Sequence, residues 1–146
     1  MNIRGIFTTT ILFCLPWLCH AEQSQSFGDY TVHYSAFTTD VLNPAVAKNY
    51  HIQRSKNRAL LNVSVLKKVM GTTSKPVRAT ISGSAINLNQ QLRDLDVREL
   101  TEDGAIYYIA VVNVSNNETL KYTLHITPEG ETTPFTLTFD QAFVTD

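Results

Sequence analysis

The chain has 146 residues, of which 43% are hydrophobic and 17% charged, and its formal net charge is −1. This length supports one domain with a hydrophobic core of its own. Six glycines, five prolines and two cysteines exclude a collagen-like chain and a disulfide-dense scaffold, and the hydrophobic content excludes a disordered chain. The near-zero net charge argues against a nucleic-acid-binding protein.

The first 21 residues have the order of a secretory signal peptide. A short start that carries Arg4 precedes an apolar run over residues 5–18, and Cys19 and Ala21 place small residues before a cleavage site. The run is too short for an ordinary membrane-spanning helix, and no later run is longer. We therefore expect a cleaved leader and a mature chain, residues 22–146, that does not span a membrane.

Both cysteines, Cys14 and Cys19, belong to this leader. Phe13 and Leu18 precede them, where an acylated lipoprotein would need a small residue, so we expect no lipid anchor. The mature chain is predicted to be periplasmic or secreted, and it enters an oxidising compartment without a disulfide.

Apolar and polar residues alternate with a period of two along most of the mature chain, which indicates strands. We predict seven of them, over residues 30–36, 61–65, 77–82, 94–98, 106–114, 120–126 and 135–139. Residues 106–114 are apolar in both phases, as in a central strand buried on two faces. Asp103 and Gly104 predict a tight hairpin turn, because both tolerate positive φ.

Seven short antiparallel strands predict an all-β fold, specifically an immunoglobulin-like sandwich formed as one domain over residues 22–146. A small β-barrel is the alternative. One short helix interrupts the strands at residues 43–50, where Asn43 can cap the helix and Pro44 suits its first turn. This helix lies between the first two predicted strands, so we expect it at a crossover between sheets.

Catalytic and metal-binding residues are not evident. His33, His51 and His125 have no ligand-like spacing. Secreted copper carriers add methionine ligands, and after cleavage Met70 is the only methionine left. We therefore assign no metal site and no cofactor. Ser82-Gly83-Ser84 lacks the frame of a nucleophile elbow. Asp94 and Asp96 share a strand face, which is more typical of a solvated sheet than of acid–base catalysis. A small envelope hydrolase remains an alternative function.

Residues 50–58 form the most unusual stretch, with three fixed cations within five residues. Its candidate binding residues are Tyr50, His51, Arg54, Lys56, Asn57 and Arg58. Such side chains can bind carboxylate, phosphate or sugar groups, and arginine offers a planar two-pronged donor. The alternative is a hydrophilic linker whose cations keep a sheet edge soluble.

This segment is part of a resemblance between the sequence and a known protein family. Together with residues 60–65, and with residues 27–30 and 43–44 before it, the sequence resembles a secreted family of Gram-negative bacteria called domain of unknown function 4426. The resemblance covers nearly the whole mature chain and is most specific at residues 54–58. It implies a small exported β-domain and brings no activity, ligand or catalytic residue with it.

Charge is distributed unevenly along the chain. Residues 41–93 hold nine basic residues and no acidic one, whereas residues 94–146 hold ten acidic and two basic residues. If the fold separates these sets, a basic patch attracts anionic partners such as lipid head groups, envelope polymers or an acidic protein surface. If the fold makes them neighbours, the charges pair internally. We therefore expect a non-catalytic binding or accessory module; a subunit of an envelope complex is a further alternative.

Overall fold

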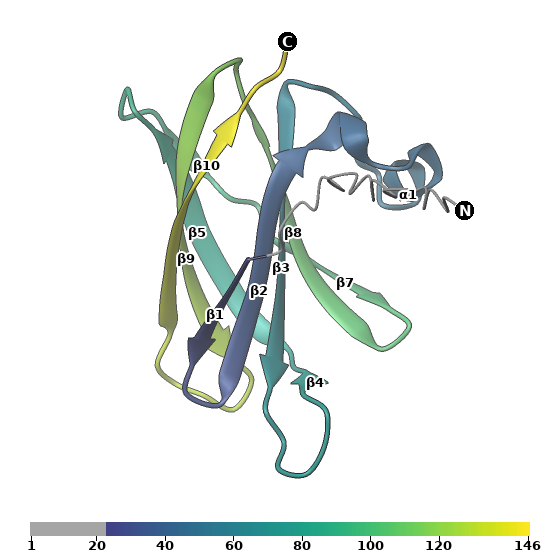
Figure 1. Cartoon of the computed structure of the whole chain (residues 1–146), viewed down its shortest axis with the longest axis vertical. Coiled ribbons are helices and arrows are strands. Elements are labelled where there is room, and N and C mark those ends of the chain that lie inside the picture. Colours follow the sequence, from purple (N-terminus) through teal and green to yellow (C-terminus); the bar gives the residue numbers. More distant parts are fainter. Residues whose placement is uncertain (1–22) are drawn as a thin grey trace, which may run out of the picture.

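The computed structural model describes residues 23–146, and the predicted signal peptide lies outside the described residues. Two antiparallel sheets pack face to face as a β-sandwich, with a short helix beside one end (Figure 1). The described residues contain no helix that is long and apolar enough to cross a membrane.

The elements follow one another as strands with a single helical interruption. In chain order they are β1 (Gln23–Phe27), β2 (Tyr30–Thr38), the 3-10 turn η1 (Thr39–Val41), α1 (Pro44–Asn49), β3 (Arg58–Lys67), β4 (Lys75–Pro76), β5 (Ala79–Asn87), β6 (Leu92–Asp94), β7 (Arg98–Glu102), β8 (Ala105–Asn113), β9 (Glu118–Pro128) and β10 (Phe135–Phe143).

The larger sheet has the order β1-β2-β3-β8-β7, with the short β4 also paired to β3, and the smaller sheet has the order β10-β9-β5-β6. Every paired strand is antiparallel to its partner. The strands do not close into one barrel, so the sandwich prediction is confirmed and the barrel alternative is wrong.

The predicted number of strands is too low. Six of the predicted strands correspond to β2, β3, β5, β8, β9 and β10, but residues 95–97 are not a strand. They link β6 in the smaller sheet to β7 in the larger one, so Asp94 and Asp96 do not share a strand face. The hairpin turn between β7 and β8 is confirmed, with φ values of 49° at Asp103 and 81° at Gly104.

The core lies between the two sheets and is built from the alternating apolar residues of both inner faces. Its fully buried members include Val32, Leu61, Val63, Leu120, Tyr122, Leu124 and Leu137. At one side of the sandwich the rings of Phe27 and Phe135 stack with centroids 4.9 Å apart. This contact joins the hairpin of β1 and β2 to the edge strand β10.

The predicted helix is confirmed as α1, and Asn43 caps it by accepting a hydrogen bond from the Ala45 amide at 2.9 Å. Its expected place at a crossover between sheets is wrong. α1 joins β2 to β3, which are neighbours in the larger sheet. Around α1, Ala47 and Ile52 pack against Leu60 and Ile109 in a second apolar cluster. This cluster accounts for the apolar residues in both phases of β8.

Candidate functional site

The cationic loop, which we define as residues 54–58, leads from α1 into β3. The side chain of Thr39 in η1 is fully buried beneath it. The Thr39 hydroxyl lies 2.8 Å from the carbonyl oxygen of Gln53 and accepts a hydrogen bond from the Ser55 amide at 2.9 Å. These bonds fix the backbone at the start of the loop.

The charged side chains of this loop face solvent. Arg54 and Lys56 are exposed and Arg58 is half-buried. The guanidinium of Arg54 donates to the carbonyl oxygen of Asp40 at 2.6 Å. Among residues 23–146, no carboxylate forms an ion pair with any of the three cations. The loop therefore presents fixed backbone and unneutralised charge.

Tyr50 and His51 have different surroundings. The Tyr50 hydroxyl donates to the carboxylate of Glu102 on β7, and the Arg98 guanidinium donates to the Tyr50 carbonyl oxygen. The hydrogen bond to Glu102, followed by burial, raises the pKa of Tyr50 above its ordinary value. His51 is exposed and ends the helical segment with a φ of 55°. Tyr50 therefore anchors the segment to β7, while His51 stays at the surface.

The basic stretch of residues 41–93 does not form one patch. Arg58 begins β3 and Lys67 ends it, so their α-carbons are about 30 Å apart at the usual rise per residue. The first group of cations is Lys48 with the cationic loop, and the second is Lys67, Lys68, Lys75 and Arg78. Arg78 pairs with Glu99 at 3.7 Å. Arg93, the ninth cation, pairs with Glu118, and the other eight thus divide between the two ends of β3.

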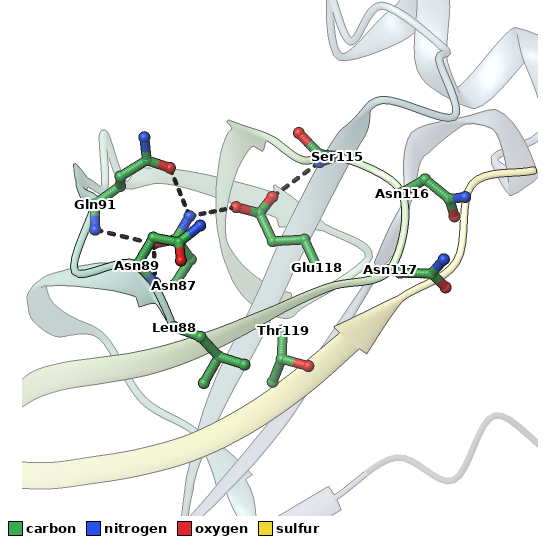
Figure 2. A pocket seen from close by; sticks show the side chains of 9 residues that line it. All are labelled: Asn87, Leu88, Asn89, Gln91, Ser115, Asn116, Asn117, Glu118 and Thr119. Atoms are coloured by element: carbon green, nitrogen blue, oxygen red, sulfur yellow. Dashed lines mark hydrogen bonds between the residues drawn. The ribbon is translucent and has the colours of Figure 1, made fainter.

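A second feature, which the sequence did not predict, is a polar pocket of about 300 Å³ (Figure 2). It lies between the turn that joins β5 to β6 and the turn that joins β8 to β9. Amide and hydroxyl side chains dominate its lining, which consists of Asn87, Leu88, Asn89, Gln91, Ser115, Asn116, Asn117, Glu118 and Thr119.

Asn87 organises one wall of the polar pocket, and its side chain uses all of its hydrogen-bonding groups. Its Nδ2 donates to Gln91 Oε1 at 2.7 Å and to Glu118 Oε1 at 2.8 Å. Its Oδ1 accepts from the amides of Asn89 and Gln91 at 3.0 and 2.9 Å. With only 7% of its surface exposed, Asn87 fixes the turn above it.

Glu118 joins the two turns of the pocket. Its carboxylate accepts from Arg93 at 2.6 Å and from the Ser115 amide at 2.8 Å. Arg93 lies opposite the fully buried Ala85 in the pairing of β5 with β6, so its side chain points toward the core. Burial acts to raise the pKa of Glu118, but the hydrogen bonds from Asn87, Arg93 and Ser115 outweigh it and hold that pKa below its ordinary value.

The polar pocket and the cationic loop lie at the same end of the sandwich. Arg58 pairs with Asn113 in the register of β3 and β8. Just beyond this pair, the amide of Val114, which follows Asn113, donates to the carbonyl oxygen of Asn57, which precedes Arg58, at 2.9 Å. The turn that lines the pocket begins at Ser115, directly after this bond. The two features are therefore adjacent.

The other candidates for chemistry are dispersed. His33 lies on β2, His51 follows α1, and His125 lies on β9 with its Nδ1 3.4 Å from the Thr136 hydroxyl. In the part of the chain that the structure describes, no group of three histidine, cysteine or acidic side chains is placed to hold a metal ion. Met70 lies in the loop between β3 and β4 and is 98% exposed.

Fold and site together define a small antiparallel β-sandwich with a helix-covered sheet and a polar end formed by loops. A family model called Domain of unknown function (DUF4426) matches residues 24–146. The chain belongs to this family. The resemblance inferred from residues 54–58 and their surroundings is thereby confirmed.

Solved structures agree with this assignment. A crystal structure of a DUF4426 family protein from Pseudomonas aeruginosa PAO1 is 37% identical, covers 86% of this chain and 96% of that chain, and superposes with a TM-score of 0.74. FetP of uropathogenic Escherichia coli strain F11, expressed in the periplasm, is 13% identical, covers 85% of this chain and 94% of its own, and has a TM-score of 0.60.

A copper-bound variant of FetP is also similar, with 13% identity, a TM-score of 0.60 and coverage of 86% of this chain and 97% of that one. At this identity the likeness to FetP shows a shared fold alone. No curated protein matches the chain.

Proposed function

We propose that this protein is an exported, periplasmic, non-catalytic binding module that contacts an anionic component of the cell envelope through its cationic loop. In this proposal the leader of residues 1–21 is removed and residues 22–146 act as one domain. The observation that carries the proposal is the combination of a fixed loop backbone with three cations that no carboxylate within residues 23–146 neutralises.

Two physical effects favour binding at this loop. Loop backbone that is already ordered loses less conformational entropy when a partner binds. Unpaired cations also attract anionic groups over a distance of roughly 10 Å at ordinary ionic strength. The arginines add planar donors that match the oxygen spacing of carboxylates and phosphates.

The test is a loop variant that combines Arg54→Ala, Lys56→Ala and Arg58→Ala. The mature protein is mixed with envelope fractions of a Gram-negative bacterium, and the bound share is measured by sedimentation. We expect the loop variant to lose most of the binding, because the partner's anionic groups lose their counter-charges.

A distal variant, Lys67→Ala with Lys68→Ala and Lys75→Ala, is the matched control. It removes the same charge from the opposite end of β3 and is expected to bind like the wild type. Equal binding by the loop variant and the wild type, with both folded by circular dichroism, would contradict the proposal. Equal losses in the two variants would show that net charge alone governs binding, and would contradict it as well.

A further inference from the structure

The polar pocket presents hydrogen-bonding groups that the fold itself does not use. The side chains of Asn89 and Asn117 are exposed, and within residues 23–146 neither makes a side-chain hydrogen bond. Ser115 and Thr119 also line the pocket (Figure 2). An amide offers a donor and an acceptor side by side, as do two neighbouring hydroxyls of a sugar. The free groups therefore fit a polyhydroxylated ligand.

The frame of the pocket is fixed before any ligand arrives. Asn87 and Glu118 are both largely buried, and the bond between them joins the two turns at 2.8 Å. Since these turns need not become ordered on binding, the exposed amides above them can bind a ligand at a small entropic cost.

Charge next to the pocket restricts the ligand further. The only carboxylate in the pocket lining, that of Glu118, is neutralised by Arg93 at 2.6 Å. The adjacent cationic loop has no such partner among residues 23–146 and is tied to the pocket by the bond between Val114 and Asn57. A ligand that spans both features needs hydroxyl groups at one part and negative charge at the other.

We propose that the polar pocket and the cationic loop form one binding site for an acidic saccharide, that is, a sugar chain that bears carboxylate or phosphate groups. This inference rests on the proposed function and names the class of its ligand. The sugar hydroxyls bind Asn89 and Asn117, and the acidic groups bind Arg54, Lys56 and Arg58.

The experiment measures the affinity of the mature protein for four probes by calorimetry. The probes are an alginate hexamer, which carries carboxylates, phosphorylated mannopentaose, neutral mannopentaose, and a short polyphosphate, which has charge but no sugar. We expect one or both acidic saccharides to bind at least about fivefold more tightly than mannopentaose and polyphosphate. The two acidic probes distinguish carboxylate from phosphate as the recognised group.

A pocket variant, Asn89→Ala with Asn117→Gly, removes the free amides. Glycine is chosen at position 117 because the φ there is 54°, which glycine adopts without strain. We expect this variant to bind acidic saccharides about fivefold or more weakly, as the loss of one or two hydrogen bonds implies, and to bind polyphosphate like the wild type. The control is Gln23→Ala with Gln25→Ala, which removes two exposed amides from β1.

Saccharide binding by the pocket variant at wild-type affinity would overturn this inference, as would binding of polyphosphate as tightly as the acidic saccharides. Either result leaves the proposed function standing if the loop variant still loses envelope binding. Failure of the loop variant to lose envelope binding overturns the proposed function whatever the probes show. Thermal unfolding of each variant establishes that the pocket variant is folded.

Discussion

Glu118 shows how one side chain can couple the stability of the protein to pH. Its side chain is 9% exposed, and its pKa lies below its ordinary value because the hydrogen-bond donors around it favour the ionised form more than burial disfavours it. A carboxyl whose pKa is lower in the folded than in the unfolded state stabilises the fold above its unfolded pKa. That contribution is lost as the pH falls through the folded value.

We therefore expect the free energy of unfolding of the wild type to fall as the pH is lowered from about 5 to about 3, and to fall less in Glu118→Gln. Urea unfolding at a series of pH values measures both. The variant is expected to be less stable at neutral pH, because Arg93 loses its counter-charge. Parallel pH curves for the two proteins would show that Glu118 does not carry this dependence.

Gly83 shows how a residue considered for catalysis has a structural role. A Cβ at this position would lie 2.2 Å from the carbonyl oxygen of Thr123, so only glycine allows β5 to approach β9 this closely. Its neighbours Ser82 and Ser84 lie on the other phase of β5. The Ser82-Gly83-Ser84 sequence therefore reflects strand packing.

At the scale of elements, α1 depends on the sheet beneath it. Six residues are too few for a helix to persist on its own in water. Packing of Ala47 and Ile52 on Leu60 and Ile109 therefore supplies the stability of the segment. The cationic loop follows directly, so the helix also holds that loop in position.

We expect Ile52→Ala to cost about 2–4 kcal/mol and to expose residues 44–58 before the sandwich core opens. Hydrogen exchange is expected to accelerate in that segment while β9 stays protected. Val46→Ala on α1 is the control, because that side chain is 41% exposed and should cost little. Uniform acceleration across both sheets would show that the helix unfolds only together with the core.

The elements also show what sequence periodicity can and cannot predict. β2 and β9 were predicted because one face of each is buried and the other is not. The strand predicted over residues 94–98 was wrong because the same alternation of burial occurs there without strand pairing. Leu95 and Val97 are half-buried, but they lie in a link between the two sheets. Alternation reports burial and does not report pairing. β1 was missed because four of its five residues are polar and exposed.

The cationic loop could be predicted because its residues are consecutive, and its place as a site remains a proposal. The polar pocket could not, because Asn87 and Glu118 are 31 positions apart. Only the pairing of β5 with β9, in which Asn87 lies opposite Leu120, brings these two side chains together. In the sequence, the amides around them indicate turns and nothing more.

At the scale of the whole molecule, the distribution of charge follows the direction of β3. Cations that are close in the sequence lie at the two ends of β3, and Arg93 forms an ion pair with Glu118. The cationic loop alone should therefore account for the salt dependence of retention on envelope fractions. We expect binding by the wild type and the distal variant to fall steeply between about 50 and 300 mM salt, as screening lengths shorten.

The loop variant should show weak retention with little dependence on salt, because three of the four cations in the first group are gone and Lys48 alone remains. Sedimentation over a salt series measures all three proteins. A steep salt dependence that persists in the loop variant would place the charged contact elsewhere on the molecule.

The inward direction of Arg93 has a consequence for self-association. β6 is an edge strand of only three residues, and its central side chain is a cation held against Glu118. A foreign strand that paired there would gain few backbone hydrogen bonds and would cover a charge, both of which disfavour edge-to-edge growth. The ion pair that frames the polar pocket thus also protects this edge of the smaller sheet, within residues 23–146 that contain no cysteine to form a disulfide.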